Sequence, residues 1–378
     1  MKLVCKKLAN STLSVLPLLL FLGIGLSRVR VIVNEYGLAQ HTFSAFEIGY
    51  VRRFLIGTVL DIFYNMEDVD KSLLLNINKG FALFFLTALV VFYLRSSRYG
   101  KYAVIAVSAS IITPVGVSIY GFPELLGYSL LMFAYLFALV NGRVWLLLSL
   151  LFYILAILSS EISIIAGFAL YLLFLSVNYG VKRSVMYTLP VTGLLSYYFA
   201  FVANLSSSGG KSQLRMKEVF GELGEYAYAG LVNGFDAHFN TYQGGSHHAE
   251  YLFREVFLWS FICSVSLLVL LWLSKPDLSI AQSLLFPMST TMPIVLSYLG
   301  NDWSRWQFVI GLNYLLSFLL IVRLSPVRRI KFKMIVFLLG VVALEIFSSN
   351  QGLYDLITID DPISGIKNLL TFFTMYVS

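Results

Sequence analysis

Residues 281–300 read AQSLLFPMSTTMPIVLSYLG, and residues 307–322 read QFVIGLNYLLSFLLIV. Between them lies one short polar segment, NDWSRW, at residues 301–306. A helix needs about 20 consecutive apolar residues to cross a bilayer. The pattern therefore predicts two membrane-spanning helices joined by a turn at one membrane surface.

The turn itself carries charge. Asp302 and Arg305 stand three residues apart and face the same way if the helix continues through them. Trp303 and Trp306 are residue types that anchor helices at the membrane surface. Two interpretations remain open: a structural ion pair, or a site in which Asp302 acts as a base and Arg305 holds a phosphate.

The composition extends this interpretation to the whole chain. Of 378 residues, 58% are hydrophobic and 12% are charged, with a mean hydropathy of +0.80. Soluble domains contain about 25% charged residues. We therefore predict an all-α, polytopic transmembrane bundle of about 11 spans, within a range of about ten to twelve. The predicted spans are 12–27, 73–94, 102–120, 125–140, 144–159, 162–178, 184–203, 255–273, 281–300, 306–322 and 334–349.

Charge asymmetry orients this bundle. With a cytoplasmic N-terminus, the inner segments hold 15 of the 27 basic residues and one of the 20 acidic residues. This excess of Lys and Arg is the signature of cytoplasmic loops. The first span follows a basic start without a small-residue cleavage site, so we expect it to remain uncleaved. The net charge of +7 is then a topology signal, and we expect no nucleic-acid partner.

Two long outer loops are predicted, at 28–72 and 204–254. In the first, apolar residues recur at helical spacing, which predicts an interfacial amphipathic helix. Its aliphatic stripe is Ile48, Val51, Leu55, Val59 and Ile62; Tyr50, Arg53, Gly57 and Asp61 gather on the other side. Arg52 and Arg53 either touch lipid headgroups or form a phosphate clamp, for which the planar guanidinium is suited.

The second loop, 204–254, contains LRMKEVFGELGEYAYAGL at 214–231, a second candidate interfacial helix. Arg215 lies in it and either attracts an anionic lipid head or is solvated. Asp236, His238, His247 and His248 follow. Adjacent histidines do not predict a metal site, which needs three or four ligands at suitable spacing. His238 is a solvated loop residue or a catalytic candidate.

Three acids are predicted at the outer ends of spans: Glu124 in YGFPELLGY, Glu161 in ILAILSSEISIIAG, and Asp302. Ionisable residues at membrane depth are costly, and they are usually paired or functional. Glu161 is the clearest case, because its hairpin is too short for the tip to emerge far. It is either a functional carboxylate or the structural partner of an arginine.

YVRRFLIG at 50–57 and NDWSRW resemble two motifs of bacterial envelope membrane proteins, an RRGLLG-like stretch after the first span and a DWGRW-like stretch near the last spans. The usual role of that set is the polymerisation of O-antigen or capsule repeat units. This chain has Phe54 and Ser304 where those motifs favour Gly. Ser160 replaces the His of a His-Glu pair found in the middle hairpin of the same set.

The resemblance implies an O-antigen polymerase of the bacterial inner membrane. It would transfer glycan from undecaprenyl pyrophosphate to a lipid-linked repeat unit on the periplasmic face. The candidate phosphate ligands are Arg52, Arg53, Arg215 and Arg305; the candidate catalytic residues are Glu161 and Asp302, with His238 behind them. Expected partners are the undecaprenyl-linked oligosaccharide, membrane lipids and a chain-length regulator protein. We expect no metal ion or other cofactor.

Two alternatives remain. The first outer loop also looks like that of GT-C glycosyltransferases, which transfer one sugar from a polyprenyl phosphate. A lipid-linked oligosaccharide flippase or another transporter is the other alternative. Transporters often carry repeats and polar sites at the membrane midplane. Here the ionisable residues collect at the outer ends and in loops, which favours the enzymes.

Overall fold

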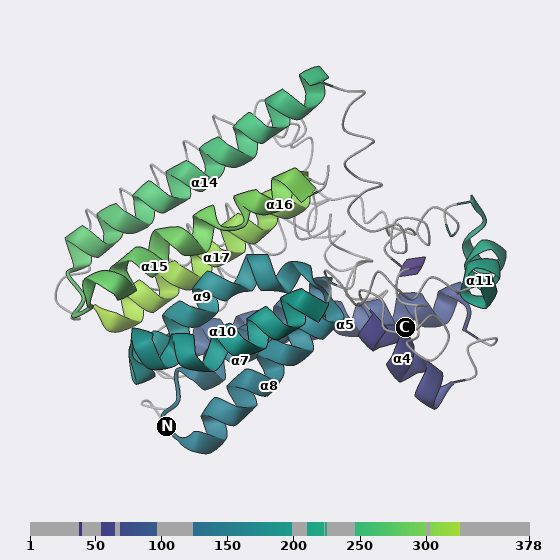
Figure 1. Cartoon of the computed structure of the whole chain (residues 1–378), viewed down its shortest axis with the longest axis horizontal. Helices are drawn as coiled ribbons and strands as arrows, with labels where there is room; N and C mark the ends of the chain where they lie inside the picture. Colours follow the sequence, from purple (N-terminus) through teal and green to yellow (C-terminus); the bar gives the residue numbers. More distant parts are fainter. Residues whose placement is uncertain are drawn as a thin grey trace, which may run out of the picture.

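The computed structural model describes residues 38–39, 54–64, 69–96, 124–198, 210–222, 224, 246–299 and 303–325. These residues form helices joined by turns, with no strand among them, which confirms the all-α fold class for this part of the chain (Figure 1). The helices are α4 (Phe54–Phe63), α5 (Lys71–Ser96), α7 (Glu124–Ala138), α8 (Arg143–Ser159), α9 (Ile162–Tyr179), α10 (Val181–Tyr197), α11 (Gly210–Phe220), α14 (Ser246–Ser274), α15 (Ile280–Thr291), α16 (Ile294–Leu299) and α17 (Trp303–Leu324).

The predicted spans can be compared with these helices. Spans 12–27, 102–120 and 334–349 lie outside the described residues, and the other predicted spans fall on helices. Two described segments are long and apolar enough to cross a membrane, α9 and the Val256–Ser274 portion of α14. Helices α7 and α8, residues 280–296 and residues 309–321 are apolar but shorter.

Apolar side chains also cover the outside of the bundle. On α14, Phe257, Phe261 and Trp272 are 50%, 56% and 71% exposed. Leu147 on α8 and Leu194 on α10 are exposed in the same way. Soluble monomers rarely present such faces to water, whereas helices in contact with lipid present them routinely.

Helices α7 and α9 pack in a regular parallel register. A β-carbon placed on Gly127 of α7 would lie 2.9 Å from Oγ of Ser163 on α9. One turn further along both helices, a β-carbon on Gly167 would lie 2.8 Å from Cδ1 of Leu131. The glycines let the two backbones approach closely, as small residues do between membrane helices.

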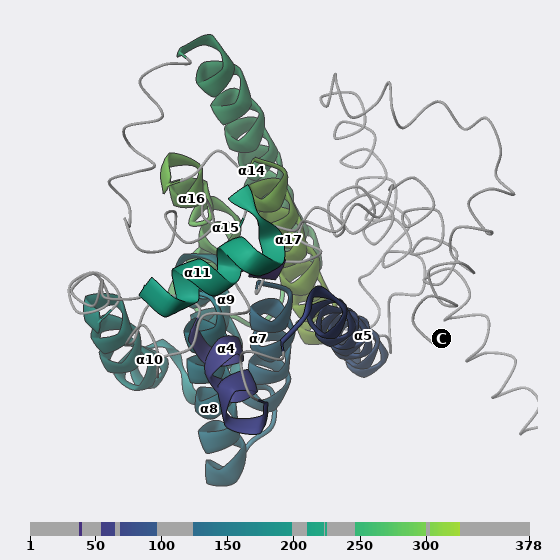
Figure 2. The same ribbon diagram turned by 90° about the vertical axis from the view of Figure 1, so that its right-hand side faces the viewer.

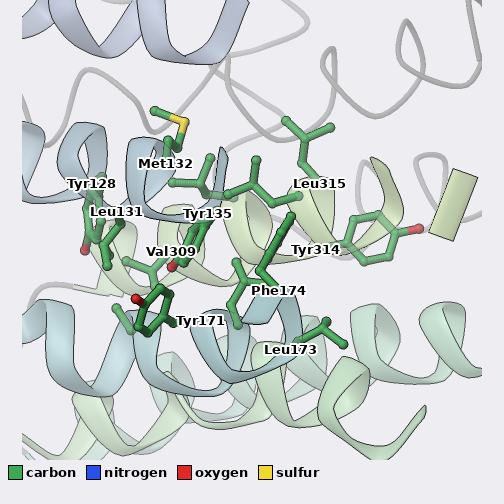
Figure 3. Packing of buried hydrophobic residues seen from close by; sticks show 14 of the residues in the cluster. Tyr128, Leu131, Met132, Tyr135, Tyr171, Leu173, Phe174, Val309, Tyr314 and Leu315 are labelled. Carbon is green, nitrogen blue, oxygen red and sulfur yellow. The ribbon is translucent and has the colours of Figure 1, made fainter. Parts of the chain in front are cut away.

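Aromatic side chains continue this register toward the middle of the bundle. Tyr135 of α7 stacks on Phe174 of α9, with ring centroids 5.0 Å apart. Tyr171 stacks on Tyr153 of α8 at 4.1 Å. Figure 3 shows Val309, Tyr314 and Leu315 of α17 in the same cluster, with Val309 toward the end where Tyr128 and Leu131 lie and Leu315 further along, so α17 runs in the same direction as α7.

Hydrogen bonds from small polar side chains join the helices. The side-chain amide of Asn313 on α17 donates to the carbonyl oxygens of Ala166 on α9, at 2.6 Å, and of Ser289 on α15, at 2.7 Å. The hydroxyls of Ser266 and Tyr314 bond at 2.7 Å and link α14 to α17. Such bonds are typical of helix packing in membranes.

The span predicted at 281–300 is interrupted, which corrects the expectation of one continuous helix. Helix α15 ends at Thr291 and α16 begins at Ile294. Pro293 has no N–H to donate and its ring crowds the preceding turn, and the backbone bonds that follow it, from Val295 to Met292 and from Leu296 to Pro293, span three residues instead of four. At the end of α15, the hydroxyl of Ser260 on α14 donates to the carbonyl of Thr290 at 2.6 Å.

Two short helices, α4 and α11, form a separate platform at one end of α5 (Figures 1 and 2). Its apolar cluster is Leu38, Ala39, Ile56, Leu60, Val69, Leu74, Met216 and Phe220. Leu126 of α7 and Leu158 of α8 pack against it. The helices predicted in the two outer loops therefore contribute to one apolar cluster at the same end of the bundle.

The exposed side of α4 corresponds to the predicted aliphatic stripe. Ile56 and Leu60 point into the platform, while Val59 and Ile62 are 43% and 61% exposed. Phe63, which follows them, is 74% exposed. The helix is apolar on both sides, one packed on protein and the other free to enter a membrane interface.

Candidate functional site

The candidate site lies where α7 begins, α8 ends and α9 begins. Only Ser160 and Glu161 connect α8 to α9. The turn is closed by backbone hydrogen bonds from the N–H of Ser160 to the carbonyl of Ala156, at 3.1 Å, and from the N–H of Ser163 to the carbonyl of Ser160, at 3.0 Å. This short connection fixes Glu161 at the tip of the hairpin, where its side chain is half-buried.

Glu124 is the first residue of α7 and is only 1% exposed. A carboxylate in the first turn of a helix is stabilised by the unpaired backbone N–H groups there. Burial of a carboxyl group is nevertheless costly, and such groups are usually functional or paired. Glu124 therefore belongs in the candidate site.

The α7–α9 register brings the two acids to the same level. Gly127 of α7 lies beside Ser163 of α9. Glu124 and Ser160 each come three residues earlier in the chain, so the same register places them at the same level. Glu161 is the next residue in the chain. Two carboxyl groups from different helices thus lie at one end of the bundle.

Hydroxyl groups surround this end of the bundle. Ser159, Ser160 and Ser163 have no exposed surface. The hydroxyl of Ser159 donates to the carbonyl of Ala156 at 2.9 Å. Those of Ser160 and Ser163 have no hydrogen-bond partner among the described residues. We call Glu124, Ser159, Ser160, Glu161 and Ser163 the outer polar cluster.

A buried amide lies at a similar level on α5. Asn78 has no exposed surface, and its side-chain amide has no hydrogen-bond partner in the part of the chain that the structure describes. The start of α5 lies at the same end as the start of α7, because Leu74 and Leu126 contact the same platform. Phe84 of α5 stacks on Phe133 of α7 at 4.9 Å. Counting back from that pair places Asn78 about level with Gly127.

The structure locates the residues predicted from sequence only in part. Arg52, Arg53, His238 and Asp302 lie outside the described residues. Arg215 lies in α11 and Arg305 in the first turn of α17, and the positions of these two arginine side chains are likewise outside the description.

The directions of α9 and α17 place the backbones of Glu161 and Arg305 at the same end of the bundle. Helices α9 and α17 run in parallel, and Asn313 ties them at Ala166. At a rise of about 1.5 Å per residue, Glu161 lies about 8 Å before Ala166 along the axis of α9, and Arg305 lies about 12 Å before Asn313 along the axis of α17. The backbones of Glu161 and Arg305 are therefore less than one helical turn apart in level along the bundle.

The sequence analysis predicted that Glu124 lies at the outer end of a span, but it did not predict a catalytic role for this residue. The available signal was an acid directly after Pro123 and before a long apolar run. Sequence spacing could not show its nearly complete burial, because that depends on how closely α7 approaches the turn between α8 and α9.

The outer polar cluster can bind groups that donate and accept hydrogen bonds. Carboxylates accept, and serine hydroxyls do both. Within the described ranges there is no group of three or more His, Cys, Asp or Glu that could hold a metal ion. Carboxylates at such a place can accept a proton from a substrate hydroxyl, which is general-base chemistry.

Comparisons with protein-family models, with curated proteins and with solved structures found no match to this chain. The residues of the chain itself are therefore the basis for its proposed function.

Proposed function

We propose that this protein is an integral protein of the bacterial inner membrane, with about 11 spans, that polymerises surface polysaccharide on the periplasmic face. The exposed apolar faces of α8, α10 and α14 and the hydrogen bonds between buried polar side chains support a location in lipid. The resemblance of YVRRFLIG and NDWSRW to polymerase motifs supports the reaction.

One observation carries the proposal. The outer polar cluster places Glu124 and Glu161 at the end of an apolar bundle, beside the α4–α11 platform with its exposed apolar side. A lipid-linked glycan keeps its polyprenyl chain in the bilayer and its phosphates and sugars at the surface. A polar site at the end of the bundle, next to helices suited to the membrane interface, matches that division.

The proposed step is a glycosyl transfer. The hydroxyl of the acceptor repeat unit loses its proton to a carboxylate, Glu161 or Asp302, and its oxygen bonds to the anomeric carbon of the donor. The bond from that carbon to the pyrophosphate oxygen breaks, and the electron pair leaves with undecaprenyl pyrophosphate. Arg53 and Arg305 are the proposed cations that stabilise the departing negative charge.

Arginine-to-lysine substitutions test the phosphate clamp. A lysine keeps the charge but loses the planar fork that can bond two phosphate oxygens. We expect Arg53→Lys and Arg305→Lys to reduce polymer yield at least about tenfold, a loss of about 1.4 kcal/mol of transition-state stabilisation. Arg52→Lys is the comparison and should have a smaller effect, because Arg52 lies at the edge of the predicted lipid-facing stripe. Full activity in all three variants would leave these residues as headgroup anchors.

The function itself is tested by deleting the gene and separating surface polysaccharide on a gel. A polymerase deletion leaves only single-unit glycans, and complementation restores the ladder. An unchanged ladder in the deletion strain would remove polymerisation from consideration.

The proposed topology predicts the side of the membrane on which each turn lies. A reporter active only outside the cytoplasm should be active when fused after Phe220, in the platform. It should be silent when fused after Lys275, between α14 and α15. The physical basis is the concentration of basic residues in the inner segments. The reverse pair of results would move the outer polar cluster to the cytoplasm and refute the proposed site.

A GT-C glycosyltransferase is the second candidate. It is favoured by the helix α4 in the first predicted outer loop, because an interfacial helix in that loop is the feature shared with that class. The same gel separates the two, because a strain lacking a transferase of that kind keeps full-length chains that lack one sugar.

A further inference from the structure

We propose that the end of the bundle opposite the outer polar cluster binds an anionic phospholipid, with Arg143 and Arg183 as the ligands of its phosphate. The inference requires that the bundle lies in a membrane, and it does not depend on the proposed reaction. It rests on the way in which the fold brings the starts of α8 and α10 together.

Helices α8 and α10 run in the same direction and begin at the same level. Two residues join α8 to α9, and Gly180 alone separates α9 from α10. The side-chain hydroxyls of Tyr153 on α8 and Thr192 on α10 form a hydrogen bond at 3.0 Å. Arg143 comes ten residues before Tyr153. Arg183 comes nine residues before Thr192, so the backbones of the two arginines differ in level by only about 1.5 Å.

Two tyrosines connect the positions of these arginines across the end of α9. The hydroxyl of Tyr179, at the end of α9, donates to the carbonyl of Gly142 at 3.2 Å, and Arg143 is the next residue. The ring of Tyr187 on α10 meets the ring of Tyr179 edge-on, with centroids 6.3 Å apart. Arg183 precedes Tyr187 by four residues and therefore lies on the same face of α10.

The charge of this surface favours an anion. Both arginine side chains are exposed, and neither forms an ion pair within the part of the chain that the structure describes. Between residues 125 and 217 the sequence contains a single acid, Glu161, which lies at the opposite end of α8. Both arginines also stand in the first turn of a helix, where the helix dipole makes a cation unfavourable. An anion bound between them would offset both charges.

Exposed apolar side chains follow each arginine toward the middle of the bundle. Leu147 and Leu151 come four and eight residues after Arg143 on α8, and they are 66% and 48% exposed. Leu194 comes eleven residues after Arg183 on α10 and is 70% exposed. These spacings keep each set on one face of its helix. Two basic residues above apolar faces match a phospholipid, with its phosphate at the membrane surface and its acyl chains along the helices.

The test measures lipid-induced stabilisation of the purified full-length protein in a detergent with an uncharged head. The probes are dioleoyl phosphatidylglycerol, dioleoyl phosphatidylcholine, which has the same chains and no net charge, and glycerol 3-phosphate, which has no chains. A ligand that binds only the folded state raises the unfolding temperature. We expect phosphatidylglycerol to raise it more than phosphatidylcholine does, and glycerol 3-phosphate to leave it unchanged.

The extra stabilisation by phosphatidylglycerol should be lost in Arg143→Gln and in Arg183→Gln. Without lipid, both variants should unfold at the wild-type temperature or higher, because each removes a cation from the first turn of a helix. Lys182→Gln is the matched control. Lys182 is also exposed, and the variant loses the same charge, but its side chain is rotated about 100° around α10 from that of Arg183. This variant should keep the stabilisation.

Four results would overturn the inference. They are equal shifts with the two phospholipids, a shift with glycerol 3-phosphate alone, a shift that persists in both arginine variants, and an equal loss in Lys182→Gln, which would show only a general effect of charge. If an arginine variant is less stable without lipid, native mass spectrometry of its folded fraction decides, and retained phosphatidylglycerol counts against the site. A phosphatidylglycerol shift together with an unchanged polysaccharide ladder in the deletion strain would refute the proposed function and leave the lipid site standing.

Discussion

Glu161→Gln is expected to abolish long-chain polysaccharide while the protein remains in the membrane at a normal level. The amide keeps the shape of the side chain and cannot accept the proton of an acceptor hydroxyl, and loss of a general base typically costs roughly 100-fold or more in rate. Single-unit glycan should accumulate. The measurement is a polysaccharide gel from a deletion strain that expresses the variant, with protein quantified in the same membranes.

Glu124→Gln distinguishes a shared site from a single carboxylate. Glu124 lies level with Ser160 and is almost wholly buried, so we expect its amide also to lower polymer yield. Asp302→Asn tests the third acid in the same assay. If a variant instead vanishes from the membrane, the acid is a structural partner. A normal ladder in all three variants would shift attention to His238 and the 204–254 loop.

Gly167→Leu is expected to prevent stable folding. A β-carbon at this position would already lie 2.8 and 2.9 Å from the two methyl carbons of Leu131 and 3.2 Å from the hydroxyl of Tyr135. Both neighbours are buried and cannot move aside without disturbing the α7–α9 contact. Overpacking of this kind costs about 1–3 kcal/mol, and a leucine adds more volume than a single methyl group.

Gly193→Leu is the matched control. Gly193 lies within α10, and a β-carbon added there would meet no atom within 4 Å. Because glycine is a poor helix former, a leucine there should leave stability unchanged or raise it by up to about 1 kcal/mol. The measurement is the thermal unfolding temperature in detergent, together with the amount of protein in the membrane. Equal behaviour of the two variants would contradict the close packing of α7 and α9.

The long apolar runs predicted most of the described helices, because hydrophobicity over many residues is a strong local signal. Residues 255–273 and 306–322 coincide closely with parts of α14 and α17. The interruption at Pro293 was missed, since its effect was outweighed by the apolar run on either side. The ends of the helices were predicted less well: α14 begins at Ser246, within the predicted outer loop.

Features that depend on tertiary packing could not be predicted. The stripe of α4 was recognised, but that helix has apolar residues on both sides, and only the fold shows that Ile56 and Leu60 face the protein. Glu124 and the hydroxyls of Ser160 and Ser163 are buried because of the register between α7 and α9. No local sequence pattern predicts that register.

The two-residue turn at Ser160 and Glu161 has a consequence for the proposed enzyme in its membrane. Helix α8 has 17 residues, which rise about 26 Å, whereas the hydrocarbon core of a typical bilayer is about 30 Å thick. No loop is present to adjust the height of Glu161, so acyl-chain length decides whether that carboxyl group meets headgroups or hydrocarbon. Longer lipids should slow polymerisation by reconstituted protein, and rates that do not vary with chain length would separate this turn from the reaction.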